Sequence, residues 1–160
     1  MLNHLEPYLL MPSALTPTAL IERADQLAAS AALRDALLGL GEVPVRIRHT
    51  PLYDAWLLPW AAGSVADLHS HDGSYGAVAA VHGVLRETVS TADGVRERIV
   101  RPGDRHGYRP GDAHRLAAGD ARAVTLHLSS PPLPSGPCFS AAPLVGAGPA
   151  RRTAAGITVR

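Results

Sequence analysis

The chain has 160 residues, of which 46% are hydrophobic and 18% charged, values typical of a soluble globular protein with one domain. Its 15 basic residues, all arginine, nearly balance 14 acidic residues, so the charge gives no reason to expect a nucleic-acid or anionic-membrane partner. The single cysteine, Cys138, excludes an internal disulfide.

The N-terminus lacks a basic segment followed by an apolar one, so no signal peptide is predicted. No apolar stretch approaches the ~20 residues that a membrane-spanning helix needs. We therefore expect a cytoplasmic protein without a membrane partner, and we further expect a monomer.

Residues 1–41 are predicted to be helical. Thr16-Pro17 is a typical helix start, and apolar residues then recur at helical spacing from Leu20 to Ala28. A second helix is predicted from Ser30, ending at Gly39 or Gly41. These helices are expected to pack on the side of a sheet.

Residues 43–130 are predicted to form strands, because short apolar runs alternate there with turn residues. Asp93-Gly94 is a hairpin signal between two of these runs. Many short strands without an intervening helix indicate an all-β sandwich or barrel rather than a parallel α/β sheet. The predicted strands are Val43–Ile47, Tyr53–Trp60, Tyr75–Val81, Leu85–Thr91, Val95–Val100 and Ala123–Leu128.

Residues 131–160 are rich in proline, glycine and alanine and are predicted to be mostly loop. Ala141–Val145 and Ile157–Val159 could form edge strands. The helical, β and C-terminal segments are expected to make up one domain, 1–160.

Two histidines, His69 and His71, stand one residue apart in the stretch LHSHDGSYGAVAAVHG, which begins at Leu68. On a strand, residues two apart point to the same face, so both imidazoles would aim at one point. Neutral imidazole is a ligand for Fe, Zn, Ni, Cu and Mn. The pair therefore predicts one side of a metal site.

The spacing of these histidines resembles the first metal motif of the cupin superfamily. That motif has a glycine, five residues, the histidine pair, a glutamate after three or four more residues, and a second glycine. Gly63 and Gly83 match its glycines, whereas Gly76 stands in place of the glutamate. By this resemblance the third ligand is His114 in RPGDAHRL, with His106 as the competing position.

Further elements resemble the thiol dioxygenases of the cupin superfamily, and the cysteine dioxygenase family in particular. The stretch Gly83–Thr88 matches the pattern G-x-L-x-E-T, the pair His114-Arg115 follows, and AVTLHLSSPPL resembles a strand of the form S-x-H-x-Y-S-P-P. The resemblance covers about residues 45–133. It implies a mainly β, cupin-type (double-stranded β-helix, jelly-roll) barrel with N-terminal helices.

The resemblance also implies an activity. His69, His71 and His114 would hold Fe(II), with Ni, Mn or Zn as alternatives, and no carboxylate would join them. The family transfers both atoms of O2 to the sulfur of a small thiol such as cysteine and forms a sulfinate.

On the last predicted strand, Thr125, His127 and Ser129 occupy the positions of a Ser-His-Tyr network in the family. The resemblance assigns catalytic roles to His127 and Thr125. A serine hydroxyl cannot replace a phenol. Two alternatives follow: Tyr75 or Tyr108 supplies a phenol from elsewhere, or water fills the gap.

The family uses an arginine to bind the substrate carboxylate, and Arg48 is the nearest positional match, with Arg46 second. A guanidinium suits this role because its two N–H groups match a carboxylate. Two alternatives stay open: a metal-dependent cupin enzyme of another reaction type, and a non-catalytic cupin that binds a metal or a small molecule.

Overall fold

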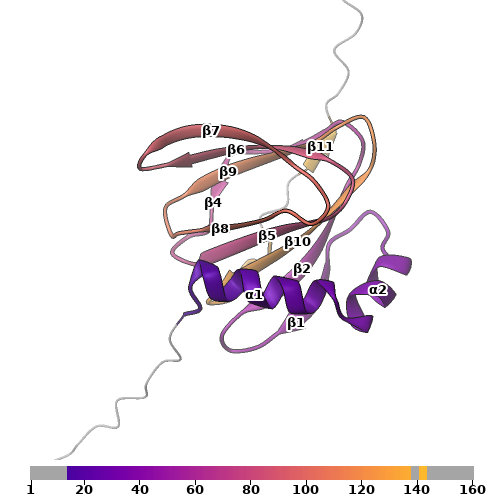
Figure 1. Cartoon of the computed structure of the whole chain (residues 1–160), viewed down its shortest axis with the longest axis horizontal. Coiled ribbons are helices and arrows are strands. Elements are labelled where there is room, and N and C mark those ends of the chain that lie inside the picture. Colours follow the sequence, from indigo (N-terminus) through magenta and orange to yellow (C-terminus); the bar gives the residue numbers. More distant parts are fainter. Residues whose placement is uncertain (1–13, 138–140, 144–160) are drawn as a thin grey trace, which may run out of the picture.

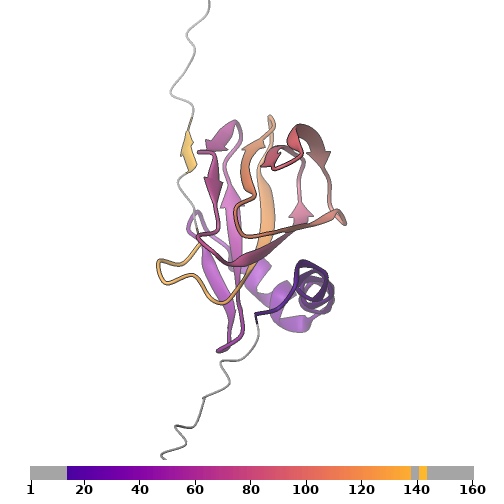
Figure 2. The ribbon, with the colours of Figure 1, turned by 90° about the vertical axis from the view of Figure 1, so that its left-hand side faces the viewer.

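Two antiparallel β-sheets face each other, and two helices lie against the outer side of one of them (Figures 1 and 2). The computed structural model describes residues 14–137 and 141–143, so Cys138 and the predicted strand Ile157–Val159 lie outside the described residues. Within them, no helix has the length and apolar character needed to cross a membrane.

The elements follow one another in chain order, with the helices first. They are α1 (Pro17–Ala28), α2 (Ala31–Leu38), β1 (Val45–His49), β2 (Asp54–Trp60), β3 (Ser64–Ala66), β4 (His69–Ser70), β5 (Tyr75–His82), β6 (Leu85–Thr91), β7 (Gly94–Val100), β8 (Arg105–Tyr108), β9 (Ala113–Ala118), β10 (Ala123–Ser130) and β11 (Ala141–Pro143).

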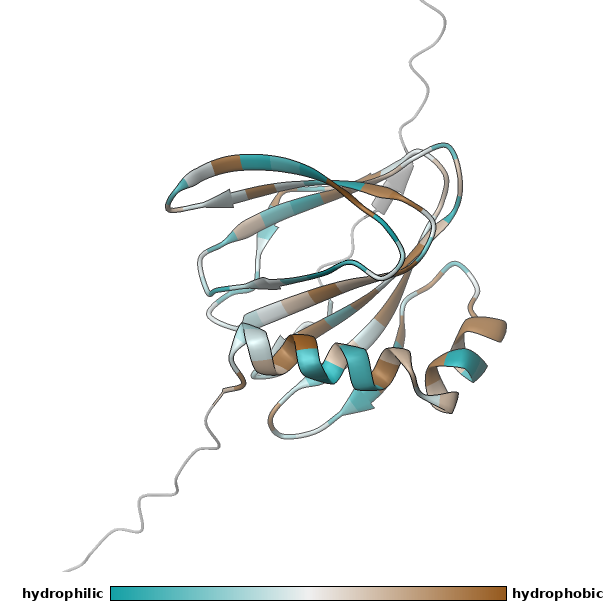
Figure 3. Ribbon diagram, in the orientation of Figure 1, coloured by the Kyte–Doolittle hydropathy of each residue, from teal (hydrophilic) through white to brown (hydrophobic). Residues whose placement is uncertain are grey.

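Both predicted helices are present and begin at the predicted caps. The Thr16 side chain accepts a hydrogen bond from the backbone N–H of Ala19, and that of Ser30 accepts one from Leu33. The second helix ends at Gly39. The N-terminal helix is amphipathic, with hydrophobic and hydrophilic residues alternating along α1 (Figure 3).

The first sheet has the strand order β1-β2-β10-β5-β8 and carries apolar residues on both faces. One face packs against the helices, and the other lines the interior between the sheets. Strand β10 is buried along its whole length because it lies in the middle of this sheet. The helix-side core consists of Leu20, Ala24, Leu27, Leu33, Leu40, Ala55, Leu57, Ala77, Ala79, Val124, Leu126 and Leu128.

The second sheet has the order β11-β3-β9-β6-β7, and the short strand β4 also pairs with β9. The predicted hairpin is present: β6 and β7 pair from Leu85 with Val100 to Thr91 with Gly94, and Gly94 has a φ of 117°. Strand β7 is at the edge, and its charged middle is flanked by apolar residues (Figure 3). The interior core consists of Leu58, Trp60, Ala66, Val78, Leu85, Tyr108, Leu116, Ala118 and Ala123.

The mainly β barrel with N-terminal helices confirms the predicted architecture. The predicted set lacks the strands β3, β4, β8 and β9, because their short, partly polar sequences have no long apolar run. The first strand begins at Val45 rather than Val43 and extends to His49. The predicted C-terminal edge strand is present as β11, which pairs with β3.

Candidate metal centre

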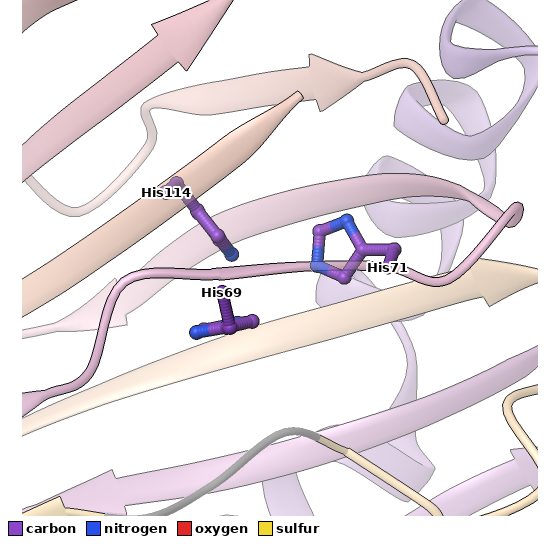
Figure 4. A group of neighbouring side chains, drawn as sticks. All are labelled: His69, His71 and His114. Atoms are coloured by element: carbon purple, nitrogen blue, oxygen red, sulfur yellow. The ribbon is translucent and has the colours of Figure 1, made fainter. Parts of the chain in front are cut away.

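Three histidines meet in the interior: His69 and His114 on the second sheet, and His71 in the turn that follows β4 (Figure 4). His69 on β4 pairs directly with His114 on β9, and His71 follows two residues after His69. The ring centroids are 4.7 Å apart for His69 and His114, 5.0 Å for His71 and His114, and 5.7 Å for His69 and His71. One nitrogen from each ring lies within 4.8 Å of the other two, a spacing at which the three could share one cation.

The two neighbouring histidines reach this point by different means. Strand β4 ends at Ser70, so the alternation expected from a strand does not extend to His71. His71 instead begins a tight turn, in which the backbone N–H of Ser74 donates to its carbonyl at 2.8 Å. Asp72 in this turn has a positive φ of 42°. The turn therefore brings the second imidazole inward.

Burial favours the neutral, metal-binding form of His69 and His71. His71 is 5% exposed and His114 is fully buried. Burial lowers the pKa of His71 to about 3, and it also lowers the pKa of His69. Two buried nitrogens, Nδ1 of His71 and Nε2 of His114, have no hydrogen-bond partner among the described residues. Such orphaned atoms are rare in proteins, and a cation would give them a partner.

The other ring nitrogens of two candidate ligands are held by oxygen atoms. Nδ1 of His69 lies 2.9 Å from the carbonyl oxygen of Asp67, and Nδ1 of His114 lies 2.8 Å from Oε1 of Glu87. An Nδ1–H that donates to oxygen leaves Nε2 with its lone pair free for a metal. The donor set therefore fits a metal ion.

The sequence does not predict the role of Glu87, although this residue is the glutamate of the G-x-L-x-E-T pattern. Its side chain accepts hydrogen bonds from His114, from the Tyr108 hydroxyl, and from Nε of Arg98 at 2.6 Å. Burial raises the pKa of Glu87, but these three donors outweigh it and lower the pKa to about 2. One signal was available: on β6, Glu87 alternates with Leu85 and Val89 and so occupies an inward position.

Tyr108, which lies on β8, packs against two of the three histidines. Its ring centroid lies 4.4 Å from that of His114 and 5.6 Å from that of His71. Burial raises the pKa of its hydroxyl well above the usual value, so this phenol stays protonated. His106 on the same strand is half-buried and is not part of the three-histidine group.

The predicted residues of β10 lie beside this group, on the face that points to the interior. Thr125 is fully buried, and its hydroxyl accepts a hydrogen bond from Nε1 of Trp60 and shares another with Nε2 of His127, each at 2.8 Å. The ring of His127 is centred 6.2 Å from that of His114. Burial lowers the pKa of His127 well below its usual value. Ser129 is paired with Asp54 and Gly76 on the neighbouring strands.

The two candidate arginines of β1 lie in different surroundings. A register shift between them interrupts the alternation of the strand. Arg46 lies over the ring of Trp56, 5.4 Å from its centroid, and Trp56 packs against the interior core. Both arginines are exposed, and Arg48 pairs with Ala55, whose side chain belongs to the helix-side core.

Gly76 explains why this site has no carboxylate ligand. A Cβ atom at Gly76 would lie 2.8 Å from Nδ1 and 2.9 Å from Cε1 of His71. The imidazole of His71 thus fills the space in which a side chain at position 76 would begin. The three-histidine group contains no acidic side chain.

Comparison with solved structures supports the fold. The chain resembles KdgF from Halomonas sp. (TM-score 0.51, 22% identity, covering 55% of this chain and 76% of that one). It also resembles TT1209 from Thermus thermophilus (TM-score 0.50, 19% identity, covering 56% of this chain and 83% of that one). A third similar structure is the Cnp3 cupin domain of Schizosaccharomyces pombe (TM-score 0.52, 10% identity, covering 59% of this chain and 66% of that one). The barrel is therefore of the cupin type. A search of curated proteins found no match.

A comparison with protein families gives a more specific result. The model of "Cysteine dioxygenase type I" matches residues 49–142, which is more than half of the chain. The matched segment contains His69, His71 and His114 together with Glu87, Thr125 and His127. The chain therefore belongs to the cysteine dioxygenase type I family.

Proposed function

We propose that this protein is an Fe(II)-dependent thiol dioxygenase, which oxidises a small thiol such as cysteine with O2 to the sulfinate. The observation that supports this best is the convergence of three imidazoles, without a carboxylate, inside the segment that matches the family. Three neutral ligands leave the charge of a divalent cation to be balanced by an anionic substrate. A thiolate is such a substrate.

His69, His71 and His114 would hold the metal. When bound, Fe(II) lowers the pKa of a coordinating thiol and activates O2 for transfer to sulfur. Ni, Mn and Zn also accept imidazole ligands, so the native metal has to be identified by metal analysis of the purified protein.

His127 and Thr125 form the polar wall of the proposed reaction site. The two side chains share a hydrogen bond, and Nε1 of Trp60 donates a second one to the threonine hydroxyl. Because burial keeps His127 neutral, one ring nitrogen can donate and the other accept. We propose that His127 and Thr125 orient the substrate beside the three histidines.

Strand β1 would provide the group that binds a substrate carboxylate. The role of Arg48 in binding the carboxylate stays a prediction. The packing of Arg46 over Trp56 favours Arg46 instead, because Trp56 pairs with His127 on the adjacent strand and packs against the interior core. A guanidinium held by an aromatic ring has fewer conformations to lose when it binds a carboxylate.

The test is O2 uptake by the Fe(II)-loaded protein with cysteine, with a mercapto-acid that lacks the amine, and with an aminothiol that lacks the carboxylate. We expect uptake and the matching sulfinate with at least one of them. His114→Ala should abolish both metal binding and uptake, whereas His106→Asn, a half-buried histidine outside the group, should retain them. No uptake with any thiol by metal-loaded protein would reject the proposal.

Ser129 favours a second candidate, a different metal-dependent reaction on the same scaffold. The phenol expected from the family is absent from this position, and the hydroxyl of Tyr108 is already bonded to Glu87 and Arg98. Metal-loaded protein that binds a thiol without consuming O2 would support this candidate or a non-catalytic binding role. Protein that binds no metal would reject both proposals.

A further inference from the structure

Glu87 stands at the centre of a buried network that ends on a candidate metal ligand. Its side chain is fully buried, and both carboxylate oxygens are used. Oε1 accepts from Nδ1 of His114 and from the hydroxyl of Tyr108, whereas Oε2 accepts from Nε of Arg98. A buried carboxylate is costly unless donors surround it, and here three donors do so.

The network is built from side chains of different strands. Glu87 on β6 lies directly opposite Arg98 on β7, and the residue two positions further along β6, Val89, lies opposite His114 on β9. Tyr108 approaches from β8, and Arg98 also donates to its hydroxyl at 3.1 Å. Arg98 thus holds the carboxylate from the side away from the histidine, and it lines a cavity of about 370 Å³ between the β6–β7 hairpin and β8.

We propose that Glu87 is a positioning residue for the metal centre, an inference that depends on the metal site of the proposed function. The carboxylate accepts a hydrogen bond from the Nδ1–H of His114. This bond fixes the ring tautomer and directs the orphaned Nε2 toward the other two histidines. Arg98 and Tyr108 hold the carboxylate in place. The fully buried ring of His114 therefore has a single competent orientation before a metal arrives.

Two variants separate the reach of Glu87 from its charge. Glu87→Gln keeps an oxygen at the same distance from His114 but removes the negative charge. Glu87→Asp keeps the charge but is one methylene shorter, so its carboxylate cannot reach Nδ1 from the same backbone position. If orientation is what matters, the aspartate variant loses metal affinity and the glutamine variant loses less of it.

The experiment measures Zn(II) affinity by competition with a chromophoric chelator and records the visible absorption of Co(II)-loaded protein. We expect Zn(II) binding to weaken by about 10- to 100-fold in Glu87→Asp, the usual effect of losing a hydrogen bond to a ligand histidine. Its Co(II) spectrum should change as well. Glu87→Gln should lose less affinity than Glu87→Asp, because its amide oxygen can still accept from Nδ1 of His114 although its NH2 group faces the donor Arg98. Glu97→Gln, which removes an exposed carboxylate of β7, is the matched control and should change neither property.

The inference is overturned if Glu87→Asp, shown to be folded by circular dichroism, binds Zn(II) as tightly as the parent protein. It is also overturned if Glu87→Gln is as weak as Glu87→Asp, because charge rather than reach would then decide. Neither readout requires turnover. An affinity pattern as expected, together with no oxidation of any thiol, would reject the proposed reaction and leave the role of Glu87 intact.

Discussion

Gly76 lies against the imidazole of His71 with no room for a side chain between them. A Cβ at this position would come within 2.8 Å of the ring, closer than atoms in contact are found. The glycine therefore sets the position of one candidate ligand from the neighbouring strand β5.

Gly76→Ala should displace the His71 ring and weaken Zn(II) binding by about tenfold or more, in the range found when the support of a ligand is disturbed. The measurement is competition with a chelator. Gly41→Ala is the control, because a Cβ at Gly41 would meet nothing within 4 Å and its backbone φ is ordinary. Unchanged affinity in Gly76→Ala would contradict the packing described here.

The metal-free protein should lose stability as the pH falls below 6.5. Burial lowers the pKa of His71 from 6.5 to about 3, so between these values the unfolded chain binds a proton that the folded chain excludes. The free energy of unfolding is highest above pH 6.5 and decreases below it. At about pH 5, His71 alone accounts for a decrease of about 2 kcal/mol. The lowered pKa values of His69 and His127 act in the same direction.

Urea unfolding at a series of pH values, with a chelator present, measures this dependence. His71→Asn removes the titrating group and should flatten the curve by about the same 2 kcal/mol. A parent protein equally stable at about pH 7.5 and about pH 5 would show that these imidazoles are not buried in solution.

Thr125→Val should destabilise the barrel, because it removes the acceptor for the indole N–H of Trp60 at almost unchanged volume. The threonine is fully buried, and losing this hydrogen bond costs about 0.5–1.5 kcal/mol in the free energy of unfolding. Thr125→Ser keeps the hydroxyl and should lose less. Denaturant unfolding of the three proteins decides the question, and equal losses in both variants would mean that packing rather than hydrogen bonding matters here.

Arg46→Gln should lower kcat/KM for cysteine more than for 2-aminoethanethiol, which has no carboxylate. A hydrogen bond to a charged group contributes about 1.5–3 kcal/mol, which corresponds to about a 10- to 100-fold decrease. Arg48→Gln is the matched comparison on the same strand. An effect confined to Arg48→Gln would support the residue predicted from sequence, and equal effects on both thiols would exclude a carboxylate contact.

Local patterns in the sequence determined much of this protein. The caps at Thr16 and Ser30 and the hairpin at Asp93-Gly94 depend on a few neighbouring residues, so each could be predicted from the chain alone. The resemblance to a family added His114 to the pair at 69 and 71, and the structure brings the three together.

Tertiary structure alone decided how the site is supported. The pairing of His69 with His114, and the contacts of Glu87 with Arg98 and Tyr108, depend on the register between strands that are distant in the sequence. The register shift in β1 separates two arginines that simple alternation would place together. A sequence read along one strand shows which residues share a face, but only the packing of several strands determines which side chain meets them from the other side.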